Sequence, residues 1–272
     1  MAFTINGFCA EQTAKKELTE TYEPFGKSTT PKKSLVRVRF PQKDMALNYY
    51  NDRFDLKAGD LVYVEGSLEG QLGLVVEVSY NFKIKLSDYK KVIAMVDTQV
   101  HGTFHMAGSH FVTFDPAALP AAQATTWFKA PSPEAPDIVL CTDDFSFRLD
   151  DLTGMQITPA IAERGHEYYT QNRVRYLCLD GTNGYAIVEG SEVYTVEFQY
   201  HNGEISHLVC DCPCSCSCKH EFAAMLQLRE TLDLIAMYNQ DSFLHSGYFA
   251  AITKGTLFRF AIDGKNSGSF TL

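Results

Sequence analysis

Six potential metal ligands lie within eleven residues in the last quarter of the chain. From residue 210 the sequence reads C-D-C-P-C-S-C-S-C-K-H, so this stretch holds five of the eight cysteines together with one histidine. A hydrophobic core gains nothing from so many adjacent sulfur atoms, whereas thiolate and imidazole suit Zn²⁺, and a structural zinc site uses four such ligands in a closed tetrahedron. The stretch therefore predicts one structural Zn²⁺ per chain.

The order of these ligands is also informative. A Cys-x-Cys pair, Cys210 and Cys212, is followed by Pro213, a short spacer and a Cys-x-His pair, Cys218 and His220, which leads into an Ala- and Leu-rich helical segment. This order resembles the SWIM-type zinc finger, a family in which the finger is regarded as a module that binds DNA or proteins. The resemblance implies that Cys210, Cys212, Cys218 and His220 are the ligands.

Two further cysteines, Cys214 and Cys216, lie in the spacer, and either can replace a member of the first pair. Pro213 favours Cys210 and Cys212, because members of the family usually have proline directly after the second cysteine. A redox dithiol is the competing interpretation, but a thioredoxin-like site uses Cys-x-x-Cys beside a βαβ unit, and the sequence has neither. Cys214 and Cys216 are therefore expected to be free loop thiols and are kept as alternate ligands.

Length and charge limit what the rest of the chain can do. The 272 residues, of which 45% are hydrophobic, suffice for two domains. A formal net charge of -9 argues against a general nucleic-acid binder, whose affinity depends on many basic side chains. No apolar run reaches the ~18 residues of a membrane span, and no signal-peptide pattern is present. We therefore expect a cytoplasmic protein with no membrane partner, where clustered cysteines favour metal over disulfides.

The N-terminal half predicts a flexible arm over residues 1–34 and a small β-barrel over residues 35–97. The arm is polar and has no sustained hydrophobic period. In the barrel segment, Gly59–Gly66 followed by Gly70 and Gly73 resembles the KOW motif, in which a strand enters a turn of spaced glycines and leaves as a second strand. Five strands are expected, at Leu35–Phe40, Asp60–Glu65, Gly73–Val78, Phe82–Leu86 and Val92–Val96.

The most basic part of the molecule overlaps the start of this segment, and no acid occurs between Ser28 and Gln42. A solvated strand face explains such a block, and a contact with a phosphate backbone is the functional alternative. The candidate nucleic-acid contacts are Lys32, Lys33, Arg37, Arg39 and Lys43.

Five prolines between residues 116 and 136 predict a connecting segment over residues 98–136, followed by the zinc-finger domain over residues 137–243. In that domain Thr158 and Pro159 predict a helix start. A C-terminal hairpin over residues 244–272, with strands at Thr256–Ile262 and Ser267–Leu272, is expected to pack on it. The fold class is thus α+β, with an N-terminal small β-barrel and a C-terminal antiparallel sheet with helices. Its strands are predicted at Val174–Leu179, Gly184–Glu189, Glu192–Tyr200 and Ile205–Cys210.

Signatures of catalysis are missing from the sequence. It contains no P-loop, dinucleotide fingerprint, Gly-x-Ser-x-Gly elbow or His-Glu-x-x-His helix, and three cysteines with one histidine leave zinc no open coordination position. We therefore predict a non-enzymatic interaction module with a protein partner, for which a small-molecule substrate is not expected. Binding of DNA or RNA through the Lys32–Lys43 surface is the alternative, and a subunit of an enzyme complex is the third interpretation.

Overall fold

The computed structural model describes residues 2–5, 31–131, 145–214 and 217–262. Backbone contacts divide the chain into two compact units, one formed by residues 1–6 and 98–272 and the other by residues 7–97. The second unit is therefore an insertion between strands β1 (Ala2–Ile5) and β7 (Gly102–Ala107), which pair antiparallel in the first unit. The described residues combine helices with two antiparallel sheets, so the expected α+β class is confirmed.

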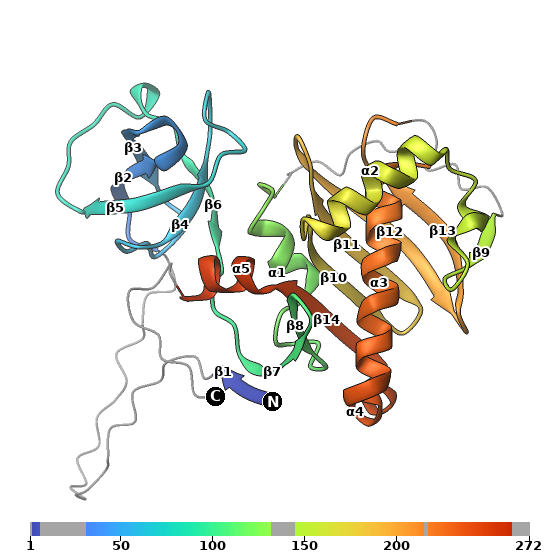
Figure 1. The fold of residues 1–272 in the computed structure, drawn as a ribbon. Coiled ribbons are helices and arrows are strands. Elements are labelled where there is room, and N and C mark those ends of the chain that lie inside the picture. The colour runs from blue at the N-terminus through green and yellow to red at the C-terminus, as the bar shows by residue number, and fades with distance from the viewer. Residues whose placement is uncertain (1, 6–30, 132–144, 215–216, 263–272) are drawn as a thin grey trace, which may run out of the picture. The chain divides into compact units, whose positions relative to one another are not determined.

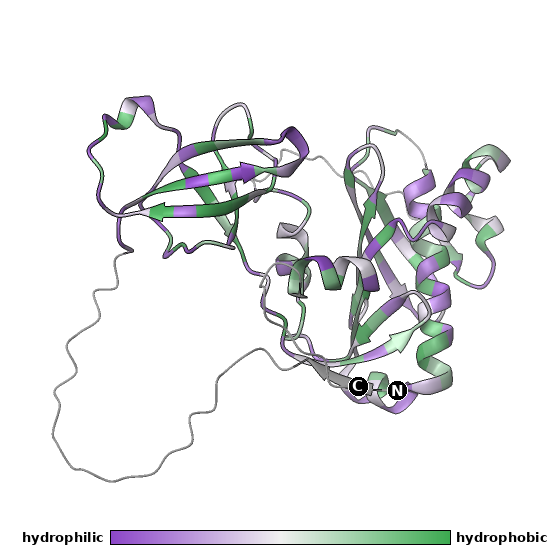
Figure 2. Ribbon diagram, turned by 60° about the vertical axis from the view of Figure 1, so that its left-hand side comes forward, coloured by the Kyte–Doolittle hydropathy of each residue, from purple (hydrophilic) through white to green (hydrophobic). Residues whose placement is uncertain are grey.

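The inserted unit is a five-stranded sheet with the order β3-β2-β5-β4-β6. Its core side carries Val36, Val38 and Phe40 from one strand, while the residues between them face solvent, as the two-residue period of a strand requires. Figure 2 shows this alternation as green and purple positions along the strands. The strands are β2 (Ser34–Phe40), β3 (Met45–Asn51), β4 (Leu61–Val64), β5 (Gly73–Ser79) and β6 (Val92–Val96).

The glycine spacing in this unit has a clear steric reason at Gly73. A Cβ on Gly73 would lie 2.3 Å from Cγ1 of Val38 and 2.9 Å from the Phe40 ring, so only glycine lets β5 approach these core residues. Gly59, Gly66 and Gly70 all adopt positive φ, which glycine reaches without a Cβ penalty. Strands β4 and β5, which flank Gly66 and Gly70, pair with each other.

Two expectations for this unit need correction. The described strands do not form a closed barrel, because the edge strands β3 and β6 approach each other only near one isolated bridge, between Tyr50 and Lys91, and no ladder follows from it. The predicted strand at Phe82–Leu86 is also wrong, since residues 82–85 have no regular structure and a 3-10 turn, Leu86–Asp88, begins at Leu86. Its place is taken by β3, which pairs with β2 along its whole length and whose asparagines concealed the strand pattern.

The larger unit is built on a nine-stranded antiparallel sheet with the order β1-β7-β8-β14-β10-β11-β12-β13-β9. The meander that precedes the predicted metal ligands is confirmed, since its four strands match the predicted runs to within two residues. The strands not yet given are β8 (His110–Thr113), β9 (Ser146–Arg148), β10 (Val174–Asp180), β11 (Asn183–Glu189), β12 (Val193–His201), β13 (Glu204–Cys210) and β14 (Tyr248–Thr253).

Helix α3 (Lys219–Tyr238) lies across strands β10 to β13, and helix α2 (Pro159–Thr170) packs on α3 (Figure 1). The predicted start of α2 is confirmed, because the Thr158 hydroxyl accepts a hydrogen bond from the Ile161 N–H and Pro159 is the first helical residue. The two helices approach closely at the buried Gly165, where a Cβ would lie 2.8 Å from the Phe222 ring. The helices and the sheet enclose the core of this unit, which includes Leu177, Ala224 and Leu228.

The opposite face of the sheet contacts helix α1 (Ala121–Thr126) and the chain around it. The Tyr176 hydroxyl donates to the carbonyl of Leu119, and the Tyr185 hydroxyl hydrogen bonds to Thr125. Residues 98–131, expected to be a connecting segment, therefore contribute β7, β8 and α1 to the larger unit. The prolines that suggested a connector lie in the turn before α1 and in the residues beyond it.

The C-terminal region also differs from the expected hairpin. After helix α4 (Gln240–Ser246), strand β14 inserts between β8 and β10, and all six of its residues are buried. The predicted strand at Thr256–Ile262 is instead helical, formed by α5 (Lys254–Leu257) and a π-helical turn (Phe258–Ile262). Its proposed partner at Ser267–Leu272 lies outside the described residues. Of the helices in the described ranges, none combines the length and apolarity needed to cross a membrane.

Candidate metal centre

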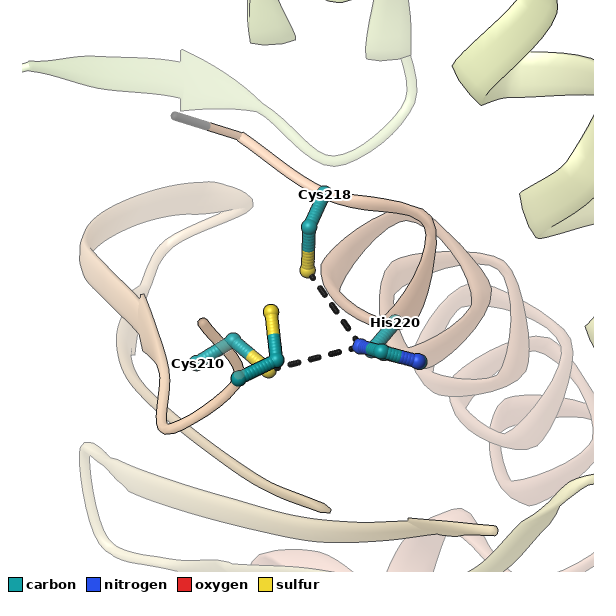
Figure 3. Close-up of side chains that lie close together, drawn as sticks. Cys210, Cys218 and His220 are labelled. Atoms are coloured by element: carbon teal, nitrogen blue, oxygen red, sulfur yellow. Dashed lines mark hydrogen bonds between the residues drawn. The ribbon is translucent and has the colours of Figure 1, made fainter. Parts of the chain in front are cut away.

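The four predicted ligands meet where strand β13 ends and helix α3 begins. Figure 3 shows three of them, Cys210, Cys218 and His220. Cys210 is the last residue of β13, Cys218 is the N-cap of α3 and His220 lies in the first turn of that helix. Together with Cys212, their ligand atoms all lie within 4.8 Å of one another, and three of the four residues are buried. Within the described part of the chain, this is the one Cys, His, Asp or Glu group compact enough to hold a metal ion.

The two distances from His220 to its neighbouring sulfur atoms agree with the edges of a ligand tetrahedron. The Nδ1 atom of His220 lies 3.7 Å from the sulfur of Cys210 and 3.7 Å from the sulfur of Cys218. Zinc bonds of ~2.3 Å to sulfur and ~2.0 to 2.1 Å to nitrogen place tetrahedral sulfur and nitrogen ligands about 3.6 Å apart. These side chains can therefore hold one ion, with Nδ1 as the nitrogen ligand.

Glu221 connects both ligand-bearing segments. Its carboxylate accepts a hydrogen bond of 2.7 Å from the backbone N–H of Cys218, and the backbone N–H of Cys210 also donates to it. In return the sulfur of Cys218 accepts from the backbone N–H of Glu221, which completes a capping box at the start of α3. Burial, and next the nearby Cys218 thiolate, raise the pKa of Glu221 to about 8. A metal cation bound in the centre would stabilise the ionised Glu221 carboxylate and so oppose this rise in its pKa.

Asp211, the residue between the first two cysteines, fixes the Cys-x-Cys loop. Its carboxylate accepts hydrogen bonds from the backbone N–H of Thr195 at 2.7 Å and from the Thr195 hydroxyl at 2.8 Å. The ammonium group of Lys129 lies 2.6 Å from the same carboxylate. Three donors thus hold the peptide that joins Cys210 and Cys212 against strand β12 and the segment after α1.

The ring of His220 is held by aromatic neighbours. It stacks on Tyr194, with ring centroids 4.3 Å apart, and Tyr168 packs at 5.5 Å. Nε2 faces Gly190, where an added Cβ would lie only 3.2 Å from that nitrogen and 3.3 Å from the Tyr168 hydroxyl. Among the described residues Nε2 has no hydrogen-bond partner, so the ring orientation depends on packing and on the contacts of Nδ1.

The three cysteines of this group differ in the pKa values of their thiols. The Cys210 thiol donates to the Cys218 sulfur, and this hydrogen bond, with those from His220 and from the Glu221 backbone, lowers the pKa of Cys218 to about 4. The same hydrogen bond and burial raise the pKa of Cys210, and burial raises that of Cys212 to about 12. Cys218 is therefore the most acidic of the three thiols, and binding of a metal by all three sulfur atoms would release protons.

The other predicted site residues lie elsewhere. Cys214 is exposed and is not part of the four-residue group, and Cys216 lies outside the described residues. The basic residues belong to the inserted unit, where Lys32, Lys33 and Lys43 are exposed. Arg37 and Arg39 point to solvent from β2, and Arg39 forms an ion pair of 3.5 Å with Asp44.

Sequence reasoning missed the residues that support the ligands, namely Glu221, Asp211, Tyr194 and Lys129. The spacing from Cys218 to Glu221 is that of a capping box, so this contact could have been anticipated. Asp211 and Tyr194 offered no such signal, because their partners come from segments distant in sequence.

Comparison with models of known protein families, with curated proteins and with solved structures gave no match. The centre is therefore characterised by its geometry alone. It is a site formed by three cysteines and one histidine, and it can hold one metal ion.

Proposed function

We propose that the centre binds one structural Zn²⁺ as a SWIM-like finger and that the chain is a non-enzymatic module that binds a protein partner. The observation that carries the proposal is the closed set of three sulfur atoms and one imidazole nitrogen, all within 4.8 Å of one another.

The donor set favours zinc and a structural role. Three thiolates and one imidazole are soft, borderline ligands that suit Zn²⁺, whereas Mg²⁺ and Ca²⁺ require oxygen. Because the protein supplies all four ligands, no coordination position remains for a reacting water. The ion would instead join β13 to α3, two elements that the spacer alone could not hold in register.

A protein partner is favoured over DNA at the finger because helix α3 is not a basic recognition helix. Its Lys219 and Arg229 are outnumbered by the acidic residues Glu221, Glu230 and Asp233. Near the centre, Lys219 lies 4.6 Å and Arg173 lies 5.6 Å from the ring of Tyr168. Tyrosine and arginine are enriched at binding hot spots, so we assign the partner to the surface around this ring and its two cations.

The proposal is tested in two stages on the full chain. Elemental analysis should give one zinc per chain for the wild type and for Cys214→Ser, and less for Cys218→Ser. Crosslinking with quantitative mass spectrometry should then recover the same partner protein with wild type and Cys214→Ser, and lose it with Lys219→Glu. A folded wild-type chain that contains no metal refutes the zinc assignment, and equal recovery by Lys219→Glu refutes this interface.

Nucleic-acid binding by the inserted unit is the second candidate. Arg37 and Arg39 face solvent from one side of β2, and residues 31–97 carry eleven Lys and Arg against nine Asp and Glu, although the whole chain has a net charge of -9. The double variant Arg37→Glu, Arg39→Glu should weaken binding and reduce its salt dependence, because each lost phosphate contact removes counterion release. Binding unchanged by this variant would exclude this surface.

A further inference from the structure

A second candidate site lies in the larger unit, away from the helices α2 and α3. A cavity of about 450 Å³ opens over strands β10 to β13. Its lining includes Cys178 and Tyr185, which are cross-strand partners, and Tyr185 is hydrogen bonded to Thr125 of α1. Since cross-strand partners share one face, the cavity lies on the face of the sheet that α1 contacts. Its volume is within the range of small-ligand sites.

The cavity has an uncompensated negative charge. Asp180 and Glu197 line it and are exposed, and no lysine or arginine is among the lining residues. Within the described part of the chain, neither carboxylate forms a salt bridge. A ligand that enters this cavity therefore gains most if it carries a positive charge.

A β-bulge turns further polar groups into the cavity. Glu197 pairs with Val209 and Gln199 pairs with Ser206, so two residues of β13, His207 and Leu208, lie opposite a single residue of β12. His207 adopts a φ of 51°, a conformation that non-glycine residues rarely take. This bulge lets the His207 imidazole line the cavity beside the carboxylates and the amide of Gln199.

The spacing of these groups argues against an inorganic ion. Among the described residues Asp180, Glu197 and His207 do not form a group compact enough to share a metal. The lining also includes the apolar side chains of Val209 and Ala121 and the buried Cys178 thiol. Carboxylates that share a cavity with apolar side chains match an organic cation with an alkyl chain.

We propose that this cavity binds an alkylammonium group, with Asp180 and Glu197 as the counter-charges and with Val209 and Ala121 contacting the alkyl chain. The group can belong to a free amine or to a lysine side chain of a protein partner. The proposal does not depend on the metal centre, because none of its residues is a metal ligand.

The test is a titration of the full-length protein with n-pentylamine, followed by ¹H–¹⁵N correlation spectra. We expect saturable shifts of the Tyr185, His207 and Val209 amides that weaken as salt is added. The double variant Asp180→Asn, Glu197→Gln should weaken binding on the order of tenfold, as expected for two exposed ion pairs. The control Glu163→Gln, an exposed carboxylate on α2, should bind as the wild type does.

Matched probes separate the contribution of the positive charge to binding from that of the apolar contacts. They also show whether the alkylammonium group comes from a free amine or from a lysine side chain. Pentanol and pentanoate have the same chain without the positive charge, and the proposal fails if either binds as well as pentylamine. It also fails if pentylamine gives no saturable shift at these amides, or if the double variant binds equally well. Tighter binding of N-acetyl-lysine methylamide than of pentylamine assigns the cavity to a protein side chain, and the reverse order assigns it to a free amine.

Discussion

The carboxylate of Glu221 accepts a hydrogen bond of 2.7 Å from the backbone N–H of Cys218, while the sulfur of Cys218 accepts one from the backbone N–H of Glu221. A proposed metal ligand is thus also the N-cap of the helix that carries His220. This double role means that loss of the metal and fraying of the helix start should occur together.

Replacing Cys218 should unfold the region around the centre. Structural zinc binding is worth ~10 to 16 kcal/mol in finger peptides, comparable to the ~5 to 15 kcal/mol stability of a whole domain. We expect Cys218→Ser to lose zinc and the protection of the α3 amides, measured by metal content and hydrogen exchange. Cys214→Ser is the matched control, because Cys214 is exposed and outside the four-residue group. Equal protection in both variants would contradict a structural metal.

Glu221 should affect metal affinity without being a ligand. Glu221→Ala leaves the N–H of Cys218 without its partner, and loss of such a supporting hydrogen bond typically weakens metal binding by roughly 10- to 100-fold. We expect a lower zinc affinity in competition with a chromophoric chelator. Glu221→Gln keeps one acceptor oxygen and should recover part of the affinity. Wild-type affinity of the alanine variant would show that the capping box does not position the centre.

A methyl group at Gly165 should separate helices α2 and α3. The added Cβ would lie 2.8 Å from the Phe222 ring and 3.0 Å from the Lys219 carbonyl, and overpacking of this kind costs ~1 to 3 kcal/mol. We expect Gly165→Ala to lower the free energy of unfolding by this amount in urea titrations. Gly255→Ala is the control, since nothing lies within 4 Å of its Cβ position. Equal destabilisation by both changes would refute the steric argument.

His110 should make the protein less stable in mild acid. Its Nε2–H donates to the Val174 carbonyl, Nδ1 accepts from Ser109, and burial lowers the pKa of the imidazole to about 4. Arg175 and Lys254 act in the same direction. As pH falls below about 6.5, His110 binds a proton in the unfolded chain but not in the folded chain. The free energy of unfolding therefore decreases as pH falls from about 6.5 toward 4. The loss approaches about 3 kcal/mol.

The measurement is the difference in unfolding free energy between wild type and His110→Gln across pH 4 to 7. Groups common to both proteins, including the proposed metal ligands, cancel in this difference. We expect His110→Gln to have the flatter profile, because glutamine has no proton to gain. Parallel profiles would show that the pKa of His110 is the same in the folded and unfolded states.

Local sequence rules were most successful where the partners of a residue are close in the chain. The start of α2 at Thr158 and Pro159, the meander from β10 to β13, and the grouping of Cys210, Cys212, Cys218 and His220 all follow from short spacings. The same rules failed at β3, whose asparagines concealed the pattern, and at Thr256–Ile262, where an alternating apolar run is helical.

The sequence by itself determined the α+β class, the ligand cluster and the helix that follows it, because each depends on contacts between near neighbours. Only the tertiary structure decided that residues 7–97 form a separate unit inserted in the sequence between β1 and β7. It also decided that β14 lies between β8 and β10 in the sheet, and that Asp211 is held by Thr195 and Lys129. These features join segments far apart in the chain. Their stability comes from burial and pairing that appear only after the chain has folded, so no local pattern of residues encodes them.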